Sequence, residues 1–350
     1  MDFNKYLVFL FVFVLLSCDK DEKEEILFDE LRNGYLVLNE GLFQHNNSTV
    51  SWLDKNEEQS ISDIFLRKSG RNLGDTGNDM KRYGGKIYIA VTTSSTLEIQ
   101  DARTFENLRQ IKLHYQGVAQ QPRNMVFHSG KVYVSSFDGF INVIDTMTYA
   151  IERIPVGKNP DHLVIAENTL LVSNSGGLNF PEMDSTVFAI DLSTHQLTDS
   201  FVIGKNPGSI VYDGNNGAYV VRRGNYSNIP SELFYIDLVS KSVESMGVAA
   251  SSLVVHHNNM YVVDFNSTTH DATVSTFDLV TKTITTNQTL NFENHVQTFY
   301  GLFPQDDGSF LVLDAMSFTN QGFLRFFDEN GTYQKSVRCG LNPTKLIKYD

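Results

Sequence analysis

The sequence predicts an all-β protein, a seven-bladed β-propeller built from four-stranded blades. The first observation is an aspartate that closes a short apolar strand seven times, at intervals of 47, 44, 46, 46, 41 and 50 residues. The seven segments are Trp52-Leu53-Asp54, Ile99-Gln100-Asp101, Val143-Ile144-Asp145, Ala189-Ile190-Asp191, Tyr235-Ile236-Asp237, Thr276-Phe277-Asp278 and Phe326-Phe327-Asp328. A repeat of about 45 residues that holds several strands is typical of a propeller blade.

The second observation is a constant order of elements inside each repeat. An apolar first strand, such as residues 125–127, is followed by a short Gly or Asn turn and a second strand, such as residues 133–135. A loop of variable length leads to the third strand, which ends at the recurring aspartate. A fourth strand then runs into Gly-Lys-Asn-Pro at 157–160 and 204–207, or Gly-Leu-Asn-Pro at 340–343. This order predicts four antiparallel strands per blade.

Composition supports the same fold class and excludes several others. The 350 residues include 25 Phe, 15 Tyr and 24 Gly but only 8 Pro, and hydrophobic residues make up 41%, which is enough for a sizeable core and excludes global disorder. The net charge of −13 argues against a nucleic-acid partner, which needs clustered cations. Two cysteines exclude a disulfide-rich scaffold and a four-thiolate zinc site.

The two ends of the repeat region predict how the ring closes. Residues 34–39 have the pattern of a second strand with no first strand before it, and residues 342–349 have the pattern of a first strand with nothing after it. We expect the two segments to complete one blade, which removes two exposed sheet edges. The sequence therefore predicts a single propeller domain over residues 34–350.

The first 33 residues predict an export signal and a tether. Lys5 precedes an apolar run from Leu7 to Leu16, which is too short for a mature membrane span. The run ends in Leu15-Leu16-Ser17-Cys18, which resembles a bacterial lipobox, so we expect a signal peptide over 1–17 and a lipid on Cys18. An ordinary secretory signal with a coincidental cysteine is the alternative. If Cys18 is lipidated, Cys339 is expected to be an inert, packed thiol.

Residues 18–33 then form the lipidated cysteine and an acidic tether. The run at 19–25 is strongly charged, as solvated tethers are, and its position also resembles the export signal of Bacteroidetes surface lipoproteins. That resemblance implies a lipid-anchored, surface-exposed location at the outer membrane.

Strand direction separates the loops into two faces. The loops after each second strand and before each first strand open on one face, where they are long and varied, and such loops on a rigid scaffold commonly carry binding sites. Aromatic, amide and basic side chains there suit a ligand with a broad apolar plane and polar edges. The candidate loop residues are Phe43, His45, Phe137, Asn179, Phe180, Arg222, Arg223, Tyr226, Phe265, His270 and Phe318. The alternative for each aromatic is packing within its own loop.

A second candidate set lies at the channel mouth, where the first strands begin. The aligned residue pairs there differ in charge while the next residue stays apolar, which predicts a polar, asymmetric funnel above a packed core. We select Arg123, His162 and Tyr300 from this set as ligand-binding candidates. Ordinary solvated channel lining is the alternative.

The sequence lacks the motifs of the common catalytic and metal sites. It has no HExxH, CxxC, GxSxG or phosphate-binding Gly-Lys-Ser/Thr segment. The recurring aspartates occur once per blade, which favours turn capping over a calcium site. We therefore expect no enzyme activity, no cofactor and no metal, with an enzyme built from scattered funnel residues as the alternative.

The repeat resembles the seven-bladed YncE-like propellers. Asn39-Glu40-Gly41-Leu42-Phe43 and residues 46–51 are similar to a Bacteroidetes surface-lipoprotein branch described as a domain of unknown function. Some members of that branch bind cobalamin at the cell surface above a TonB-dependent vitamin B12 transporter. The resemblance implies capture of a corrinoid and transfer to such a transporter. A protein–protein or glycan-adhesion module without a small-molecule site is the second hypothesis.

Overall fold

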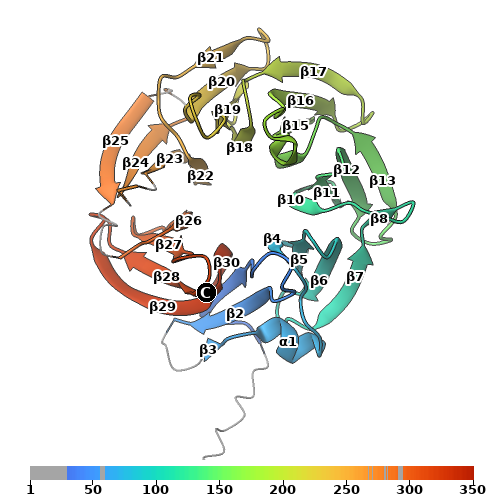
Figure 1. Cartoon of the computed structure of the whole chain (residues 1–350), viewed down its shortest axis with the longest axis vertical. Helices are drawn as coiled ribbons and strands as arrows, with labels where there is room; N and C mark the ends of the chain where they lie inside the picture. Colours follow the sequence, from blue (N-terminus) through green and yellow to red (C-terminus); the bar gives the residue numbers. More distant parts are fainter. Residues whose placement is uncertain are drawn as a thin grey trace, which may run out of the picture.

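The chain folds into a ring of seven antiparallel sheets. The computed structural model describes residues 30–350 apart from 56–59, 267, 270, 280, 282 and 291–294. Within the described residues, each of the seven sheets has four strands and radiates from a central axis (Figure 1). The prediction of an all-β, seven-bladed propeller is therefore confirmed. The predicted signal peptide and Cys18 lie outside the described residues.

Six blades are continuous in sequence, and each runs from an inner first strand to an outer fourth strand. Their strands are β4 Gly77–Tyr83, β5 Lys86–Val91, β6 Thr96–Asp101 and β7 Asn107–Lys112; β10 Pro122–His128, β11 Lys131–Ser136, β12 Phe140–Asp145 and β13 Ile151–Pro155; β14 Pro160–Ala166, β15 Thr169–Asn174, β16 Thr186–Asp191 and β17 Leu197–Val202; β18 Pro207–Tyr212, β19 Gly217–Arg222, β20 Glu232–Asp237 and β21 Val243–Ser245; β22 Ser252–His256, β23 Asn259–Asn266, β24 Asp271–Asp278 and β25 Thr283–Leu290; and β26 Phe299–Pro304, β27 Phe310–Asp314, β28 Gln321–Phe327 and β29 Tyr333–Leu341.

The seventh blade joins the two ends of the propeller. Its strands, from the axis outward, are β30 Pro343–Tyr349, β1 Gly34–Asn39, β2 Thr49–Asp54 and β3 Ser60–Ile61. β30 pairs antiparallel with β1 from Gly34↔Tyr349 to Leu38↔Lys345. The Tyr349 ring packs edge-on against Trp52 at 5.7 Å, and its hydroxyl donates to the carbonyl of Ala102 in the next blade at 2.7 Å. This pairing confirms the predicted ring closure.

Few helices and strands of the described chain lie outside the blades. α1 Ile64–Ser69 follows β3, η1 Gly177–Asn179 lies in the loop between β15 and β16, and β8 His114–Tyr115 pairs with β9 Val118–Ala119. None of the helices in the described part is long and apolar enough to cross a membrane.

The apolar core lies between neighbouring blades. One buried cluster, for example, combines Tyr133 and Val143 of one blade with Leu163 and Leu170 of the next. Cys339 packs in another cluster, 4% exposed, and burial raises the pKa of its thiol to about 12. The prediction that Cys339 is a packed thiol is confirmed.

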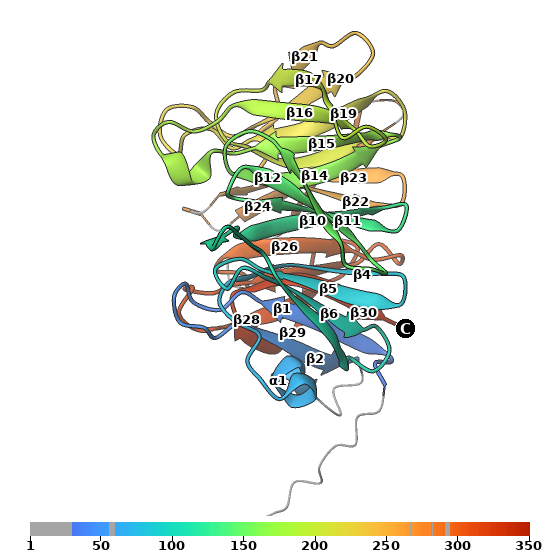
Figure 2. The same cartoon turned by 90° about the vertical axis from the view of Figure 1, so that its right-hand side faces the viewer.

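The two faces of the ring differ as the strand directions predict (Figure 2). We call the face that carries the loops between second and third strands the loop face; it includes loops 40–48, 175–185 and 223–231. The other, the turn face, carries the short turns between first and second and between third and fourth strands. The β30 strand ends on the turn face, where the C-terminus is marked in Figure 2.

The recurring aspartates cap turns on the turn face. The Asp145 carboxylate accepts hydrogen bonds from the backbone N–H groups of Met147 and Thr148 at 2.9 and 2.7 Å. Asp191 does the same for Ser193 and Thr194 at 2.9 and 2.8 Å. The prediction of turn capping is thus confirmed, because the carboxylate satisfies turn donors that no strand partner reaches.

First strands begin with a register shift that shapes the axis. Among the described strands, β4, β10, β14, β18, β26 and β30 each skip one or two residues at their loop-face end, where they pair with the second strand. Such a bulge leaves residues without a ladder partner and re-aims their side chains. The bulged residues include Arg123, Asp161, Gly208 and Tyr300, so most of the channel-mouth positions lie in these bulges.

A Gly-x-Asn-Pro motif precedes three of these bulged strands, β14, β18 and β30, and its asparagine contacts a loop on the loop face. Asn159 and Asn342 have φ of 44° and 55°, a left-handed conformation that asparagine tolerates better than most residues. Their side-chain amides donate to the carbonyls of Phe137 and Gly41 at 2.8 Å, in the loop-face segment of the neighbouring strand pair. In these blades the motif therefore ties the first strand to a loop on the loop face.

Removal of residues 342–350 tests the closure. The deletion removes β30 and exposes β1 as a new sheet edge while it uncovers the Trp52 side chain. We expect aggregation or a fall in melting temperature of about 10 °C or more, measured by circular dichroism. The matched control removes only Asp350, whose exposed contact with Lys55 contributes little. A nine-residue deletion that melts like this control would contradict the closure.

The capping aspartates predict acid sensitivity. Backbone hydrogen bonds, from Thr148 and Thr194 first, hold the pKa values of Asp145 and Asp191 below their ordinary value of 3.8. A pKa lowered by folding means that the ionised carboxylate stabilises the fold above pH 3.8, and that this contribution is lost as the pH falls further. We expect the melting temperature of the double variant Asp145→Asn, Asp191→Asn to fall less than that of wild type when the pH is lowered from 5 to about 3. If the melting temperatures of the variant and wild type fell equally with pH, these carboxylates would not contribute to the acid sensitivity of the fold.

Candidate functional site

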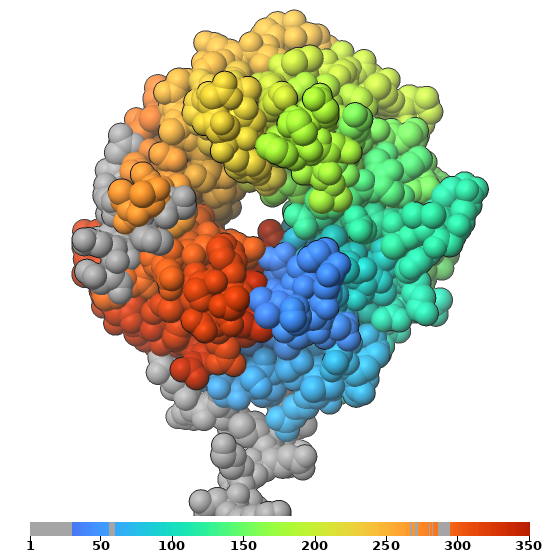
Figure 3. Space-filling view, viewed as in Figure 1, coloured from blue at the N-terminus to red at the C-terminus, as the bar shows by residue number. Residues whose placement is uncertain are grey.

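A cavity opens at the loop-face end of the ring axis. Figure 3 shows this hollow at the centre of the ring, bordered by protruding loops. Its volume is about 380 Å³, and it is formed mainly by the starts of first strands and the ends of second strands. The lining residues are Glu40, Asn78, Arg123, Asn124, Asp161, His162, Arg223, Ser251, Ser252, Phe265, Phe299, Tyr300, Thr344 and Lys345.

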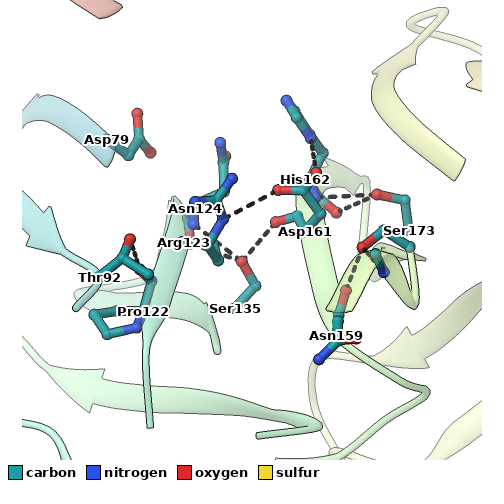
Figure 4. Close-up of polar contacts among 12 residues, drawn as sticks. Asp79, Thr92, Pro122, Arg123, Asn124, Ser135, Asn159, Asp161, His162 and Ser173 are labelled. Atoms are coloured by element: carbon teal, nitrogen blue, oxygen red, sulfur yellow. Dashed lines mark hydrogen bonds and ion pairs between the residues drawn. The ribbon is translucent and has the colours of Figure 1, made fainter. Parts of the chain in front are cut away.

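The charged centre of the cavity is Asp161 (Figure 4). Its carboxylate accepts a hydrogen bond from Nη1 of Arg223 at 2.7 Å and lies 3.3 Å from Nδ1 of His162 and 3.7 Å from Nε of Arg123. These residues come from three blades, because Arg123 starts β10, Asp161 and His162 start β14, and Arg223 follows β19. Asp161 is only 4% exposed, so its charge requires these partners.

The local electrostatics keep this carboxylate ionised. Burial alone would raise the pKa of Asp161, but its contacts with His162, Arg223 and Arg123 hold that pKa well below its usual range. Burial lowers the pKa of His162, which opposes protonation of the imidazole. The cluster is therefore best described as a buried carboxylate held mainly by two guanidinium groups.

A glycine makes room for the Arg223 side chain. A Cβ atom on Gly208 would lie 2.5 Å from Nε of Arg223, closer than packed atoms approach. Arg223 itself is positioned by its backbone N–H, which donates to the carbonyl of Asn206 at 3.0 Å. The channel-mouth position of β18 therefore holds the small residues Gly208 and Ser209 because the Arg223 side chain occupies the adjacent space.

A second polar group lies across the cavity. The hydroxyl of Tyr300 donates to Glu40 at 2.9 Å, and burial raises the pKa of Glu40 although this hydrogen bond lowers it. Nζ of Lys345 lies 3.9 Å from the carboxylate of Asp79, and burial lowers the pKa of Lys345. Lys81 approaches the same carboxylate at 3.5 Å.

Aromatic rings extend the site from the cavity to the rim. Within the cavity, Phe265 packs against Phe299 with ring centroids 5.7 Å apart. Beside it, the guanidinium of Arg123 stacks 4.6 Å from the ring centroid of Phe137. The loop-face loops also carry exposed large side chains, namely Phe43 (68% exposed), Phe180 (66%), Tyr226 (74%) and Phe318 (47%).

The structure brings five of the predicted ligand-binding residues to one cavity. Arg123, His162, Arg223, Phe265 and Tyr300 all line it. Phe137 contacts it indirectly, through Arg123.

Other predicted residues lie on the rim or away from the cavity. Phe43, His45, Phe180, Tyr226 and Phe318 are on the exposed loops of the loop face. The side-chain amide of Asn179 donates to Asn159 at 2.9 Å and supports its own loop. His270 lies outside the described residues.

Arg222 differs from its neighbour Arg223. Nη2 of Arg222 contacts Glu232 at 2.5 Å, and its guanidinium stacks 4.8 Å from the Phe234 ring, both in its own blade. It is absent from the described lining of the cavity. Successive residues at a strand end point to opposite sides, which separates the two arginines.

Glu40, Asp161 and Lys345 line the cavity although none of them was among the predicted site residues. Asp161 and Lys345 occupy aligned channel-mouth positions, so alignment of the repeats could have identified both as cavity residues. Glu40 meets Tyr300 across 260 residues of chain, and only the closed ring reveals that contact.

Substitution of Asp161 tests the charge cluster. Asp161→Ala would leave the guanidinium groups of Arg123 and Arg223 close together without their shared carboxylate, so we expect a loss of ~3–5 kcal/mol in the free energy of unfolding. The matched control is Asp199→Ala, which breaks a 2.6 Å pair with the half-exposed Lys241 and should cost less than about 1 kcal/mol. Urea denaturation measures both. Equal, small losses would mean that the cluster contributes no pairing energy.

Comparison with known proteins gives a family and a fold. The family profile described as "Domain of unknown function (DUF5074)" matches residues 33–220, more than half of the chain. Among curated proteins, none matches the chain in sequence.

Solved structures share the architecture at low identity. A quinonprotein alcohol dehydrogenase-like protein from Bacteroides thetaiotaomicron is 15% identical with a TM-score of 0.63, and the match covers 91% of this chain and 78% of that one. The dihydro-heme d1 dehydrogenase NirN is 14% identical, with a TM-score of 0.58 and coverage of 90% and 75%. The computationally designed Ika8 protein is 12% identical, with a TM-score of 0.58 and 90% of both chains covered. These likenesses show the fold alone.

Proposed function

The chain belongs to the DUF5074 family, and we propose that it is a non-catalytic ligand-capture protein whose ligand binds at the loop-face cavity. The observation that carries the proposal is the combination of a cationic cavity with a rim of exposed aromatic rings. Arg123, Arg223 and Lys345 reach the cavity, whereas the carboxylates in its lining are Glu40 and Asp161. A concave site with a few convergent polar groups is where ligands usually bind.

The charge balance favours a ligand that carries an anionic group. Asp161 is matched by its hydrogen bond to Arg223, and Glu40 accepts a hydrogen bond from the Tyr300 hydroxyl, so both carboxylates of the lining already have partners. Nε of Arg123 is buried and makes no hydrogen bond in the described part of the chain. Its nearest carboxylate, that of Asp161, lies at 3.7 Å, which is beyond hydrogen-bond distance, so a carboxylate or phosphate of the ligand would give this guanidinium a hydrogen bond that Asp161 does not.

The size of the cavity favours a ligand that is held partly at the rim. A volume of about 380 Å³ accommodates a small group rather than a large ring system. Phe180 and Tyr226 stand on the loops above the cavity and offer apolar area to the rest of the ligand. Cobalamin combines a broad ring, amide edges and a phosphate, so it is the first ligand to test within this proposal.

The contacts of the nearby hydroxyl groups support binding rather than catalysis. Ser135 and Ser173 flank the Asp161–His162 pair, but their hydroxyls bond to the backbone carbonyls of Asp161 and His162, at 2.6 and 3.2 Å (Figure 4). A nucleophilic serine needs contact with the imidazole of a base instead. The hydroxyls fix the bulge of β14 and thereby the position of the carboxylate.

The start of the described chain supports capture from the medium. The backbone N–H of Leu31 donates to the carbonyl of Arg103 at 2.7 Å, in a turn between β6 and β7 on the turn face. A lipid anchor at Cys18 would therefore attach the protein by its turn face and leave the cavity facing outward. Delivery to a TonB-dependent outer-membrane transporter is the step that we propose to follow capture.

The exposed rim also favours a second candidate, an adhesion module for glycans or proteins. Phe43, Phe180 and Tyr226 are 68%, 66% and 74% exposed, and aromatic faces of this kind pack on sugar rings or partner surfaces as well as on a small ligand. In that case binding depends on the rim and is independent of the cavity cations.

Paired arginine variants test the proposal. Arg223 lines the cavity and Arg222 does not, so the two neighbours form a matched pair. With cyanocobalamin in isothermal titration calorimetry, we expect Arg223→Ala to lower the affinity about tenfold or more and Arg222→Ala to leave it nearly unchanged. Phe180→Ala should lower it by a comparable factor through lost apolar contact.

Two controls make the result decisive. Arg123→Gln removes a second cavity cation and keeps a polar side chain that can donate hydrogen bonds, so it tests the charge if Arg223→Ala fails to fold. Circular dichroism melting confirms that each variant is folded. Absence of cyanocobalamin binding by folded wild type would remove the corrinoid and leave the adhesion module ahead. Binding that depends on Phe180 but on neither Arg123 nor Arg223 would contradict a ligand held in the cavity.

A further inference from the structure

Three potential metal ligands converge on the turn face, away from the loop-face cavity. Nε2 of His256 and Nε2 of His257 lie 3.0 and 2.9 Å from the same carboxylate oxygen, Oδ1 of Asp306. The three ligand atoms lie within 4.8 Å of one another. His256 ends β22 and His257 begins the turn to β23, whereas Asp306 is in the turn between β26 and β27, 49 residues after His257.

The turn geometry directs two consecutive imidazoles to one point. Successive residues of a strand send their side chains to opposite faces, so neighbouring histidines normally diverge. His257 has φ of 53°, in the left-handed region that few non-glycine residues adopt. This turn places the two rings side by side, with centroids 4.2 Å apart, and directs both toward the next blade.

The Asp306 side of the cluster is also built by a tight turn. The N–H of Gly308 donates to the carbonyl of Gln305 at 3.1 Å, and Gly308 has φ of 83°, a conformation suited to glycine. The turn holds Asp306 at its tip, 72% exposed, within reach of the neighbouring blade. Lys348 is a charged neighbour of Asp306, and its ammonium group lies 3.8 Å from another carboxylate, that of Asp350.

We propose that His256, His257 and Asp306 form a binding site for a divalent transition metal ion, with zinc as the best-suited one. Two imidazole nitrogens and one carboxylate oxygen are a ligand set that zinc accepts, with bonds of about 2.0–2.2 Å and a tetrahedral arrangement. Such bonds place the ligand atoms about 3.3 Å apart. Each nitrogen is within a few tenths of an ångström of that distance from the carboxylate oxygen, and the two nitrogens are no more than 4.8 Å apart, so rotation of the imidazole rings would bring them together.

Two features favour a metal over a simple ion pair. Nε2 of His256 is buried yet makes no hydrogen bond to any residue that the structure describes, although it lies 3.0 Å from Asp306. A metal ion would satisfy this nitrogen in a way that the carboxylate does not. His257 and Asp306 are about 70% exposed, so a water molecule can complete the coordination.

The metal would cross-link two adjacent blades. His256 and His257 belong to the blade β22–β25, and Asp306 belongs to the blade β26–β29. A ligand that binds only the folded state raises its stability in proportion to the occupancy of the site. The site lies on the opposite face from the proposed ligand cavity, so its test is independent of the proposed function.

Isothermal titration of the tag-free mature protein with zinc chloride tests the site. We expect one zinc ion per chain, and we expect His256→Ala and Asp306→Asn each to weaken binding at least tenfold, since each removes one of three ligands. The matched control is His195→Ala, which removes a turn-face histidine that lies 3.4 Å from a single carboxylate, that of Glu152. We expect zinc binding to survive that change.

Thermal melting provides a second measurement that does not depend on the calorimetric signal. Saturating zinc should raise the melting temperature of wild type and of His195→Ala by a few degrees and leave His257→Ala unchanged. Zinc binding by wild type that persists in His256→Ala and His257→Ala, or no binding by wild type at all, would overturn the proposal.

Discussion

The antiparallel pairing of β30 with β1 is the constraint on which the rest of the structure depends. It joins the last residues of the chain to the first strand of the propeller and fixes the ring at seven blades within the described residues. Only a closed ring brings the starts of all the first strands to one end of the axis. The contact between Glu40 and Tyr300, 260 residues apart, exists because of this closure.

The second determinant is the burial of unlike charges where the first strands begin. Bulges release residues from the ladder and direct them toward the axis, and the cations of two blades meet the Asp161 carboxylate of a third. Such a cluster stabilises the fold weakly or not at all compared with apolar packing, and it is costly when one partner is missing. A propeller that keeps its axis polar therefore gives up core packing for a preorganised polar site.

Much of the fold was predictable because its signals are local and repeated. The capping role of Asp145 and Asp191 follows from a motif of a few residues, and the phase of closure follows from the unpaired strand patterns at 34–39 and 342–349. The channel-mouth residues were also visible, since alignment of the repeats shows where polar residues replace a constant apolar pattern.

The remaining features depend on three-dimensional geometry. The sequence did not separate Arg222 from Arg223, because the side to which each residue at a strand end points depends on the register. The meeting of His256 and His257 with Asp306 depends on a left-handed turn and on a neighbouring blade, neither of which a local pattern reveals. The proposed lipidation at Cys18 lies outside the described residues and stays a prediction.

Hydrogen–deuterium exchange of the mature protein with and without cyanocobalamin tests the central claim, that the ligand binds at the loop-face end of the axis. We predict slower exchange in the starts of β10 and β14, at residues 122–124 and 160–162, and in the loops 40–48 and 223–231 that surround the cavity. The turn-face segments, such as 146–150 and 192–196, should exchange at an unchanged rate. Protection confined to the turn face, or no protection around the cavity in excess cyanocobalamin, would contradict this account.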